Sequence, residues 1–213
     1  MYENLDHIIW ACDDLDAGMR EFCARTGVRP RFGGVHASGV TQNALVRIGP
    51  RCYLEILAPT GVPSSADDEW SRVARAAHEP RIMTYCMRSP RPLSELAAAA
   101  RSRGLKDASV ADNGRRTPEG AELKWQWTAP KLEELGAAFP FFIDWLDSPH
   151  PAATLGEPPA HESVRLREFT VLHPQAQRLR AILSELGVAI EASASDRPGF
   201  RLVLETPRGI LSL

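Results

Sequence analysis

The chain has 213 residues, 44% of them hydrophobic and 24% charged, so it can bury a core as one large domain or two small ones. Its formal net charge of −2 argues against nucleic acid or an anionic membrane surface as a partner, because both depend on clustered Lys and Arg. No apolar run approaches the roughly 18 residues of a membrane span, and no export signal precedes the first strand. Without a C-x-x-C pair, the cysteines are expected to be reduced thiols in the cytoplasm.

The segment 5–15 predicts a short apolar strand that runs directly into a helix. Because strand side chains alternate between faces, His7 is expected on the face opposite Asp6. The following helix has an aspartate available as a cap and ends at Gly27. A histidine inside an apolar strand must be hydrogen-bonded or coordinated, so His7 is a candidate functional residue.

The rest of the first unit consists of a glycine-rich segment and two strands. Residues 31–39 are glycine-rich, and His36 is expected in a loop over about 33–43. Two strand-like runs, 41–48 and 51–57, lie on either side of a Gly-Pro turn. The pattern predicts a β-α-β-β-β unit over about 4–59. A polar linker follows, with a short helical piece around 70–77.

The same order of elements returns twice, which indicates internal repeats. The second unit, about 81–146, has an opening strand, a helix that ends at Gly104 and three further strand candidates, at 108–111, 123–127 and 140–145. The first two of these are expected to be joined by a turn-rich segment that contains Asp112-Asn113-Gly114. A proline-rich linker separates it from a third, shorter unit at about 163–213. Aligning the closing strands places Asp144 of the second unit where Glu55 stands in the first.

His7 and Glu55 are each a lone polar side chain in an apolar strand, and a buried unpaired charge costs several kcal/mol. Two alternatives account for the pair without a ligand: a buried His–Glu hydrogen bond, or a Glu55 that points to solvent from an edge strand. A third alternative is a divalent metal ion held by both residues, with a third ligand from His36 or from the second unit.

A set of polar and aromatic residues predicts a pocket for a small molecule. Arginine captures carboxylates or phosphates through paired hydrogen bonds, and indoles line mostly apolar pockets. Of the neighbouring arginines 115 and 116, we favour Arg116 as the anion-binding one, beside Trp125 and Trp127; the alternative is a solvated hairpin with core tryptophans. For Asn43 the alternative is a local turn, and for His150 it is a surface turn.

Units that open with Leu-Asp-His-Ile-Ile and close with Tyr-Leu-Glu-Ile resemble the vicinal oxygen chelate superfamily, and more narrowly its glyoxalase-like domain proteins. The resemblance implies an α+β fold, in which repeated βαβββ units form a cupped mixed sheet in a single domain over 1–213. It also implies a divalent ion (Zn, Mn, Ni or Fe) bound by His7 and Glu55, with His36 or a residue of the second unit as the third ligand. We expect Glu55 and His36 to be catalytic. The expected substrate-binding residues are Asn43, Arg116, Trp125, Trp127, Asp144, Trp145 and His150.

The resemblance implies a metal-dependent enzyme of lyase, isomerase or dioxygenase type, acting on a small oxygen-rich or carbonyl/carboxylate metabolite. The second unit departs from the superfamily pattern, because Thr84 or Tyr85 stands where a second histidine is expected. The alternative function is therefore a non-catalytic binder that sequesters a small molecule in a metal-free pocket. A homodimer is also expected, since covering an exposed sheet edge favours association.

Overall fold

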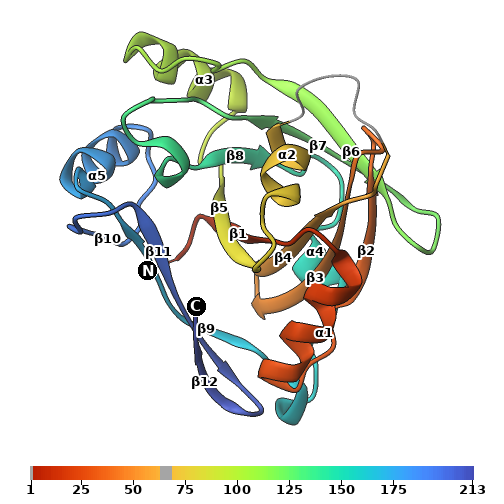
Figure 1. Ribbon diagram of the computed structural model, residues 1–213. Helices are drawn as coiled ribbons and strands as arrows, with labels where there is room; N and C mark the ends of the chain where they lie inside the picture. The colour runs from red at the N-terminus through yellow and green to blue at the C-terminus, as the bar shows by residue number, and fades with distance from the viewer. Residues whose placement is uncertain (1, 63–68) are drawn as a thin grey trace.

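The computed structural model describes residues 2–62 and 69–213, and Figure 1 shows a curled sheet flanked by helices. The first unit contains β1 (Leu5–Ala11), α1 (Leu15–Thr26), β2 (Arg31–His36), β3 (Thr41–Gly49) and β4 (Cys52–Pro59). The second contains β5 (Arg81–Arg88), α3 (Leu93–Ser102), β6 (Ala111–Arg116), β7 (Glu122–Thr128) and β8 (Phe141–Asp144). The third contains β9 (Arg165–Leu172), α5 (Ala176–Glu185), β10 (Ala192–Ser193), β11 (Gly199–Thr206) and β12 (Gly209–Ser212). The predicted α+β fold of repeated βαβββ units is confirmed.

The strands of the first two units close into one barrel, in the order β1-β4-β3-β2-β6-β7-β8-β5. β1 is parallel to β4 and antiparallel to β5, so the opening strands of the two units lie side by side. The second junction between the units joins β2 to β6. The barrel therefore has an inner face, which belongs to both units, and an outer face on which the helices pack.

The connections between the units carry short helices. α2 (Glu69–Arg75) precedes β5, and the 3-10 turn η1 (Gly136–Ala138) precedes β8. After the barrel come α4 (Pro151–Thr154) and the 3-10 turn η2 (Ala160–Glu162). Among the described residues, no helix is long and apolar enough to cross a membrane.

The ends of α1 form as the sequence predicts. Asp14 adopts an extended conformation before the helix, and its carboxylate accepts a hydrogen bond of 2.7 Å from the backbone N–H of Ala17. Gly27 ends the helix in the left-handed region, at φ 81°, where a residue with a Cβ would be strained. The strand–helix junction after β1 is thus fixed by local chemistry.

Two segments differ from the sequence prediction. Residues 33–36 were expected to be part of a loop, but they lie in β2, which pairs with β3 on one side and β6 on the other. The run Asp112-Asn113-Gly114, expected to be a turn, lies inside β6 and pairs with β7. In both segments long-range pairing overrides a local preference for a turn.

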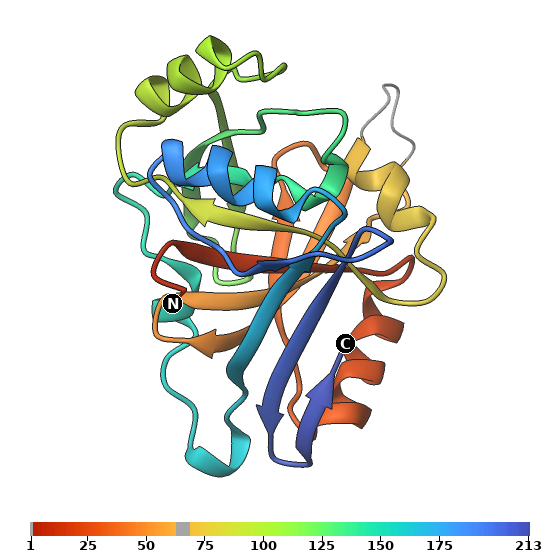
Figure 2. The same ribbon diagram turned by 90° about the vertical axis from the view of Figure 1, so that its left-hand side faces the viewer.

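The third unit forms a separate sheet, in the order β10-β9-β11-β12, against the outside of the barrel. Phe169 of β9 and Phe200 of β11 contact Tyr85 of β5, with ring centroids 5.3 and 6.1 Å apart. Figure 2 shows this sheet and α5 beside the barrel. The outer core is continuous across the junction, so the third unit buries apolar surface of the barrel without reaching its interior.

Candidate functional site

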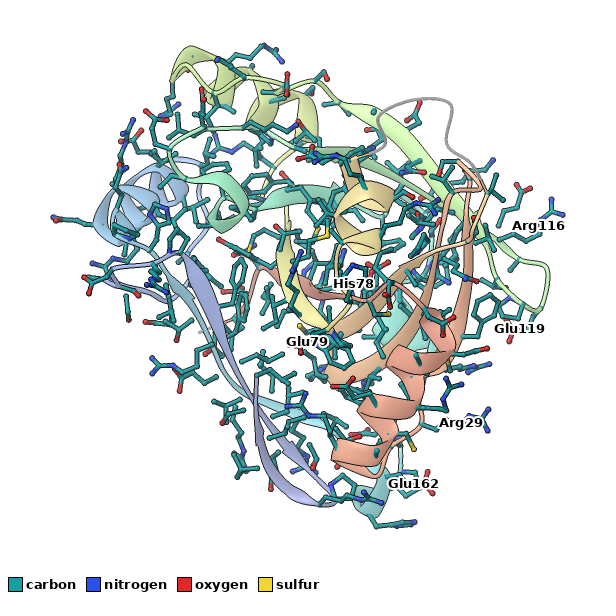
Figure 3. The ribbon with its side chains drawn as sticks, in the orientation of Figure 1. Arg29, His78, Glu79, Arg116, Glu119 and Glu162 are labelled. Atoms are coloured by element: carbon teal, nitrogen blue, oxygen red, sulfur yellow. The ribbon has the colours of Figure 1, made fainter. Side chains whose placement is uncertain are left out.

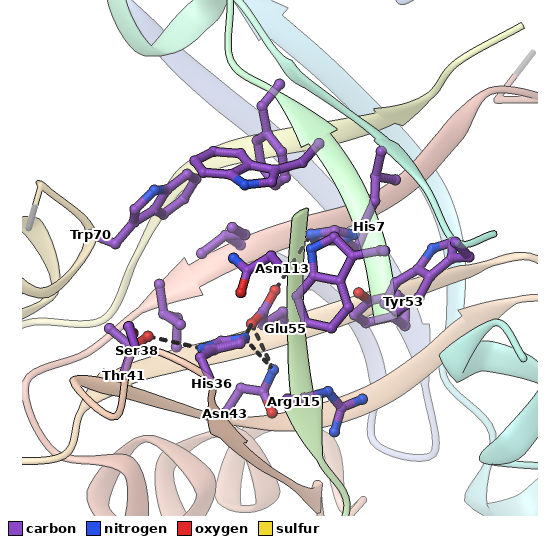
Figure 4. A pocket seen from close by; sticks show the side chains of 17 residues that line it. His7, His36, Ser38, Thr41, Asn43, Tyr53, Glu55, Trp70, Asn113 and Arg115 are labelled. Carbon is purple, nitrogen blue, oxygen red and sulfur yellow. Dashed lines mark hydrogen bonds and ion pairs between the residues drawn. The ribbon is translucent and has the colours of Figure 1, made fainter. Parts of the chain in front are cut away.

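A cavity of about 240 Å³ lies inside the barrel, and both His7 and Glu55 line it. The two residues are brought together by the parallel pairing of β1 and β4, which sets Ile9 opposite Glu55 and His7 opposite Tyr53. Figure 4 shows their side chains converging from neighbouring strands. The prediction that these strands are adjacent and that both side chains face one pocket is confirmed.

Glu55 is the centre of the polar wall of this cavity. Nε2 of His7 lies 3.4 Å from its Oε2, and Nε2 of His36 lies 3.6 Å from its Oε1. The side-chain amide of Asn43 donates a hydrogen bond of 2.7 Å to Oε1. Nδ1 of His36 is engaged on its other side, 2.8 Å from the hydroxyl of Thr41. Two imidazole nitrogens thus converge on a carboxylate that is only 5% exposed.

Aromatic rings make up much of the rest of the lining, beginning with Tyr53 beside His7. The ring of Tyr53 stacks on His7, with centroids 4.7 Å apart, and burial, aided by the charge of Glu55, raises the pKa of its phenol well above the ordinary value. Further rings come from Trp70, Trp125, Trp127, Phe141 and Trp145. The cavity therefore suits a small ligand with an apolar body and an oxygen-bearing end.

Most of the predicted substrate-binding residues line the cavity, namely Asn43, Trp125, Trp127 and Trp145. Arg116 does not line the cavity, so the prediction that it belongs to the pocket is wrong. Its side chain is 72% exposed, pairs with Glu122 at 3.2 Å and projects from the outer hairpin in Figure 3. Arg115 lines the cavity instead and donates to the carbonyl of Gly33.

The exchange of the two arginines follows from strand register. β6 pairs with β2 so that Arg115 is opposite His36, and neighbouring residues of a strand point to opposite faces. Because the expected turn at 112–114 is strand, the side chain that enters the barrel is one residue earlier than predicted. A buried arginine, with one guanidinium nitrogen bonded to the carbonyl of Gly33, therefore lines the cavity in place of Arg116.

Asp144 and His150 also lie outside the cavity. On β8, Phe141 and Ile143 face inward, so Asp144 faces outward, where its carboxylate accepts a hydrogen bond of 2.9 Å from the backbone N–H of Leu146. His150 precedes α4, and its Nε2 lies 3.1 Å from the carboxylate of Asp6, behind His7. The prediction that these two side chains line the cavity is therefore wrong.

Sequence reasoning missed several residues of the site. Trp70 was assigned to a linker helix and Asn113 to a turn, and both line the cavity. Tyr53 was noted beside Glu55 but not assigned to the site. Asp6 was placed on the opposite face from His7, yet its Oδ1 lies 2.7 Å from the Nδ1 of that ring. The signal for Asp6 was its place beside His7 in an otherwise apolar strand.

A model of the glyoxalase-like domain family matches residues 5–187, which is most of the chain. The chain belongs to this family, within the vicinal oxygen chelate superfamily. No curated protein gives a significant match.

Several solved structures have a fold similar to that of this glyoxalase-like chain. A hypothetical protein from Staphylococcus aureus superposes with a TM-score of 0.65 at 16% identity, over 98% of this chain and 84% of that one. A mutant 4-hydroxymandelate synthase from Streptomyces coelicolor gives 0.52 at 13% identity, over 99% and 62%. A methylmalonyl-CoA epimerase variant from Streptomyces coelicolor gives 0.49 at 19%, over 70% and 98%. At such identities the first two show the fold alone.

The superfamily implies a divalent ion, and two groups of side chains in this glyoxalase-like barrel are candidates for holding one. Asp6, His7 and Cys86 bring potential ligand atoms within 4.8 Å of one another. Burial raises the pKa of the Cys86 thiol well above its ordinary value, however, and Oδ1 of Asp6 is already bonded to His7. We therefore favour His7, His36 and Glu55, whose nitrogen and carboxylate donors face the cavity and match the ligand types of Zn²⁺ and related ions.

Proposed function

We propose that this glyoxalase-like protein is a metal-dependent enzyme that acts on a small metabolite with neighbouring oxygen atoms. His7, His36 and Glu55 would hold the ion. The observation that carries the proposal is the convergence of two imidazole nitrogens on the two oxygens of Glu55, at 3.4 and 3.6 Å. Each separation is close to the roughly 3.3 Å between neighbouring ligands of a tetrahedral ion with bonds of about 2.0–2.1 Å. The two nitrogens approach different oxygens, however, and His7, His36 and Glu55 together are not among the groups of described residues that bring one ligand atom each within 4.8 Å of one another. Binding of one ion would therefore draw these side chains closer together.

A bound ion would supply Lewis-acid chemistry by polarising a carbonyl oxygen of the substrate. The chain's own residues provide the rest. Asn43 fixes the orientation of the Glu55 carboxylate through Oε1, which leaves Oε2 as a proton acceptor for a carbon beside that carbonyl. Nδ1 of His36 is held by Thr41, which leaves Nε2 for the ion, and Arg115 supplies positive charge for a carboxylate. The reaction type supported best is therefore proton transfer, as in an isomerase or lyase.

A non-catalytic binder is the second candidate, and the aromatic wall favours it. Trp70, Trp127 and Phe141 contact one another edge to face, with centroids 5.2 to 6.2 Å apart, and close one side of the cavity with apolar surface. Metal content separates the two candidates.

The metal site is tested by elemental analysis of the purified protein, followed by calorimetric titration with Zn²⁺, Mn²⁺, Ni²⁺ and Fe²⁺. We expect one ion per chain. His7→Ala, His36→Ala and Glu55→Gln should each weaken binding more than about a hundredfold, because two remaining protein ligands do not offset dehydration of the cation.

The control for this titration is His78→Ala. The His78 side chain is 83% exposed and pairs with Asp13 on the surface, so its removal should leave metal affinity unchanged. Absence of uptake by the unmutated protein would exclude the metalloenzyme and leave the binder. Uptake that survives all three substitutions would move the site elsewhere. The homodimer, the cytoplasmic location and the exclusion of nucleic acid and membrane partners stay predictions.

A further inference from the structure

The carboxylate of Asp6 is completely buried directly behind His7. Its position results from a bulge in β1, where pairing with β5 passes from Leu5 opposite Met87 to His7 opposite Cys86. Asp6 is thus an extra residue that has no partner on β5, and the bulge turns its side chain toward the imidazole of the next residue. A charge placed in the core at an irregular position of a strand needs a compensating set of donors.

Ring nitrogens of three residues face the carboxylate, one from the neighbouring His7 and two from the distant segment that contains Trp145 and His150. Nδ1 of His7 lies 2.7 Å from Oδ1 of Asp6, and the indole Nε1 of Trp145 donates to Oδ2 at 3.1 Å. Nε2 of His150 lies 3.1 Å from the same Oδ2. The guanidinium of Arg88 adds a positive charge at 3.6 Å. Every oxygen of the carboxylate is therefore engaged.

The proton of the His150 ring can be placed from its second contact. Its Nδ1 accepts a hydrogen bond of 3.1 Å from the backbone N–H of Ala152, in the first turn of α4. The ring proton of neutral His150 must then be on Nε2, which makes it a donor to Asp6. Since an indole N–H can only donate, both contacts to Oδ2 are defined in direction, and both require Asp6 to accept.

The same logic fixes His7. Oδ2 of Asp6 accepts the hydrogen bonds of Trp145 and His150, and the guanidinium of Arg88 lies close to the same oxygen. In this surrounding of donors Oδ1 is also an acceptor, so the proton of a neutral His7 ring is on Nδ1, 2.7 Å away, and Nε2 is the nitrogen that faces Glu55 and the cavity. Stacking on Tyr53 holds the plane of the ring.

We propose that Asp6 is a positioning residue, which together with Trp145 and His150 sets the tautomer and orientation of His7 so that Nε2 is available to a cation. The segment that runs from Trp145 into α4 then belongs to the site although it does not line the cavity. The use of Nε2 by a metal rests on the proposed function. The tautomer of His7 does not, and it can be measured in the metal-free protein.

The test is Asp6→Asn, which keeps the shape but offers an amide that can donate to Nδ1. Nitrogen-15 NMR of metal-free protein with labelled histidine, at about pH 8 where an ordinary histidine is neutral, reports the tautomer directly. We expect the Nδ1–H form of His7 in the unmutated protein and a shift toward Nε2–H in the variant. Zn²⁺ affinity should fall about 10- to 100-fold, as for other residues that orient a metal-binding histidine. Asp144→Asn, a change of the same kind at an exposed carboxylate, should alter neither readout.

Two substitutions of His150 provide a matched pair that carries the test even if Asp6→Asn does not fold. His150→Gln keeps an N–H donor, whereas His150→Phe keeps an aromatic ring against Tyr53 and Trp145 but removes the donor. We expect Gln to preserve Zn²⁺ affinity and Phe to weaken it severalfold and to mix the His7 tautomers. Equal behaviour of the two variants, or an Nε2–H tautomer in the unmutated protein, would overturn the proposal. The expected tautomer without Zn²⁺ uptake would instead reject the metal site and leave the positioning role standing.

Discussion

Glu55 is a buried carboxylate whose charge must be balanced inside the barrel. Asn43 supplies one neutral donor, and the facing atoms of His7 and His36 are nitrogens that lie beyond good hydrogen-bond distance. Removing a carboxylate from water costs several kcal/mol unless opposite charge is close by. Arg115 brings one positive charge to the lining of the same cavity, and a bound cation would add another directly beside Glu55, so a positively charged ligand should bind more tightly.

The cysteine thiols offer a second prediction for single residues. Cys12, Cys52 and Cys86 are buried, whereas Cys23 is partly exposed. Burial raises the pKa of Cys12 from 9.0 to about 12, and it also raises the pKa values of Cys52 and Cys86. Only the thiolate reacts with a disulfide reagent, so at pH 8 we expect one fast-reacting thiol per folded chain and four after denaturation.

The raised thiol pKa values also predict whether the folded state gains or loses stability at alkaline pH. Above pH 9 the unfolded chain loses its thiol protons while folded Cys12 keeps its own until about pH 12. The unfolded state then binds fewer protons, so stability falls as pH rises through this window. Urea unfolding at pH 8 and pH 10 measures this loss of stability, and Cys12→Ala is the comparison. A variant that loses as much stability as the unmutated chain would contradict this account.

The individual residues were only partly predictable from the sequence. His7 and Glu55 could be found because each interrupts an apolar strand, and the pattern carries that information without knowledge of the fold. Choosing between Arg115 and Arg116 depends on the register of β6, where a shift of one residue exchanges the inner and outer faces. The role of Asp6 depends on a bulge, which alternation cannot foresee.

At the scale of elements, the junction between β2 and β6 decides whether the cavity is closed. Val35 pairs with Arg116 and His36 with Arg115. Gly34 lies beside this junction at φ +133°, and a Cβ built there would be 2.1 Å from the carbonyl oxygen of Arg116. Glycine is thus required for the close approach of two backbones that carry a histidine and an arginine of the site.

Gly34→Ala should therefore destabilise the protein by more than about 2 kcal/mol, since it combines backbone strain with a clash against a main-chain atom. Urea denaturation measures the loss. Gly39→Ala is the matched control, because Gly39 also has a positive φ but its Cβ would meet nothing within 4 Å. A smaller loss for Gly34→Ala than for the control would show that the junction tolerates separation.

The elements themselves were predictable where local and long-range preferences agree. The capped α1 and the apolar strands β1 and β4 formed where expected. The glycines of β2 and the Asp-Asn-Gly run of β6 have strong turn propensity, and only pairing with neighbours brought in by the fold makes them strands. These are also the two strands that meet at the junction.

At the scale of the whole molecule, the third unit supports the barrel from outside. Phe169 is fully buried between the two, 5.3 Å from Tyr85 and stacked on Phe200 at 5.9 Å. Phe169→Ala should lower the free energy of unfolding by about 3–5 kcal/mol through lost burial and a cavity. Metal affinity of the folded variant should be unchanged, since the unit contributes no residue to the described lining of the cavity.

Thermal unfolding and Zn²⁺ titration of the same preparation make this measurement. Phe32→Ala serves as the control, because Phe32 is 40% exposed and its removal should have a small effect on stability. A loss of metal affinity in correctly folded Phe169→Ala would show that the third unit reaches the site. The overall fold, unlike these contacts, was predictable, because the order of elements recurs three times in the sequence.

The two halves of the barrel are unequal. The converging histidines and Glu55 all come from the first unit, whereas the opening and closing strands of the second present Cys86, Phe141 and Ile143. The charge that the second unit brings to the lining is that of Arg115 on β6, and the rest of its inner face is mostly aromatic or apolar. Substitutions among those apolar residues should therefore change which ligand body fits while leaving His7 and Glu55 in place.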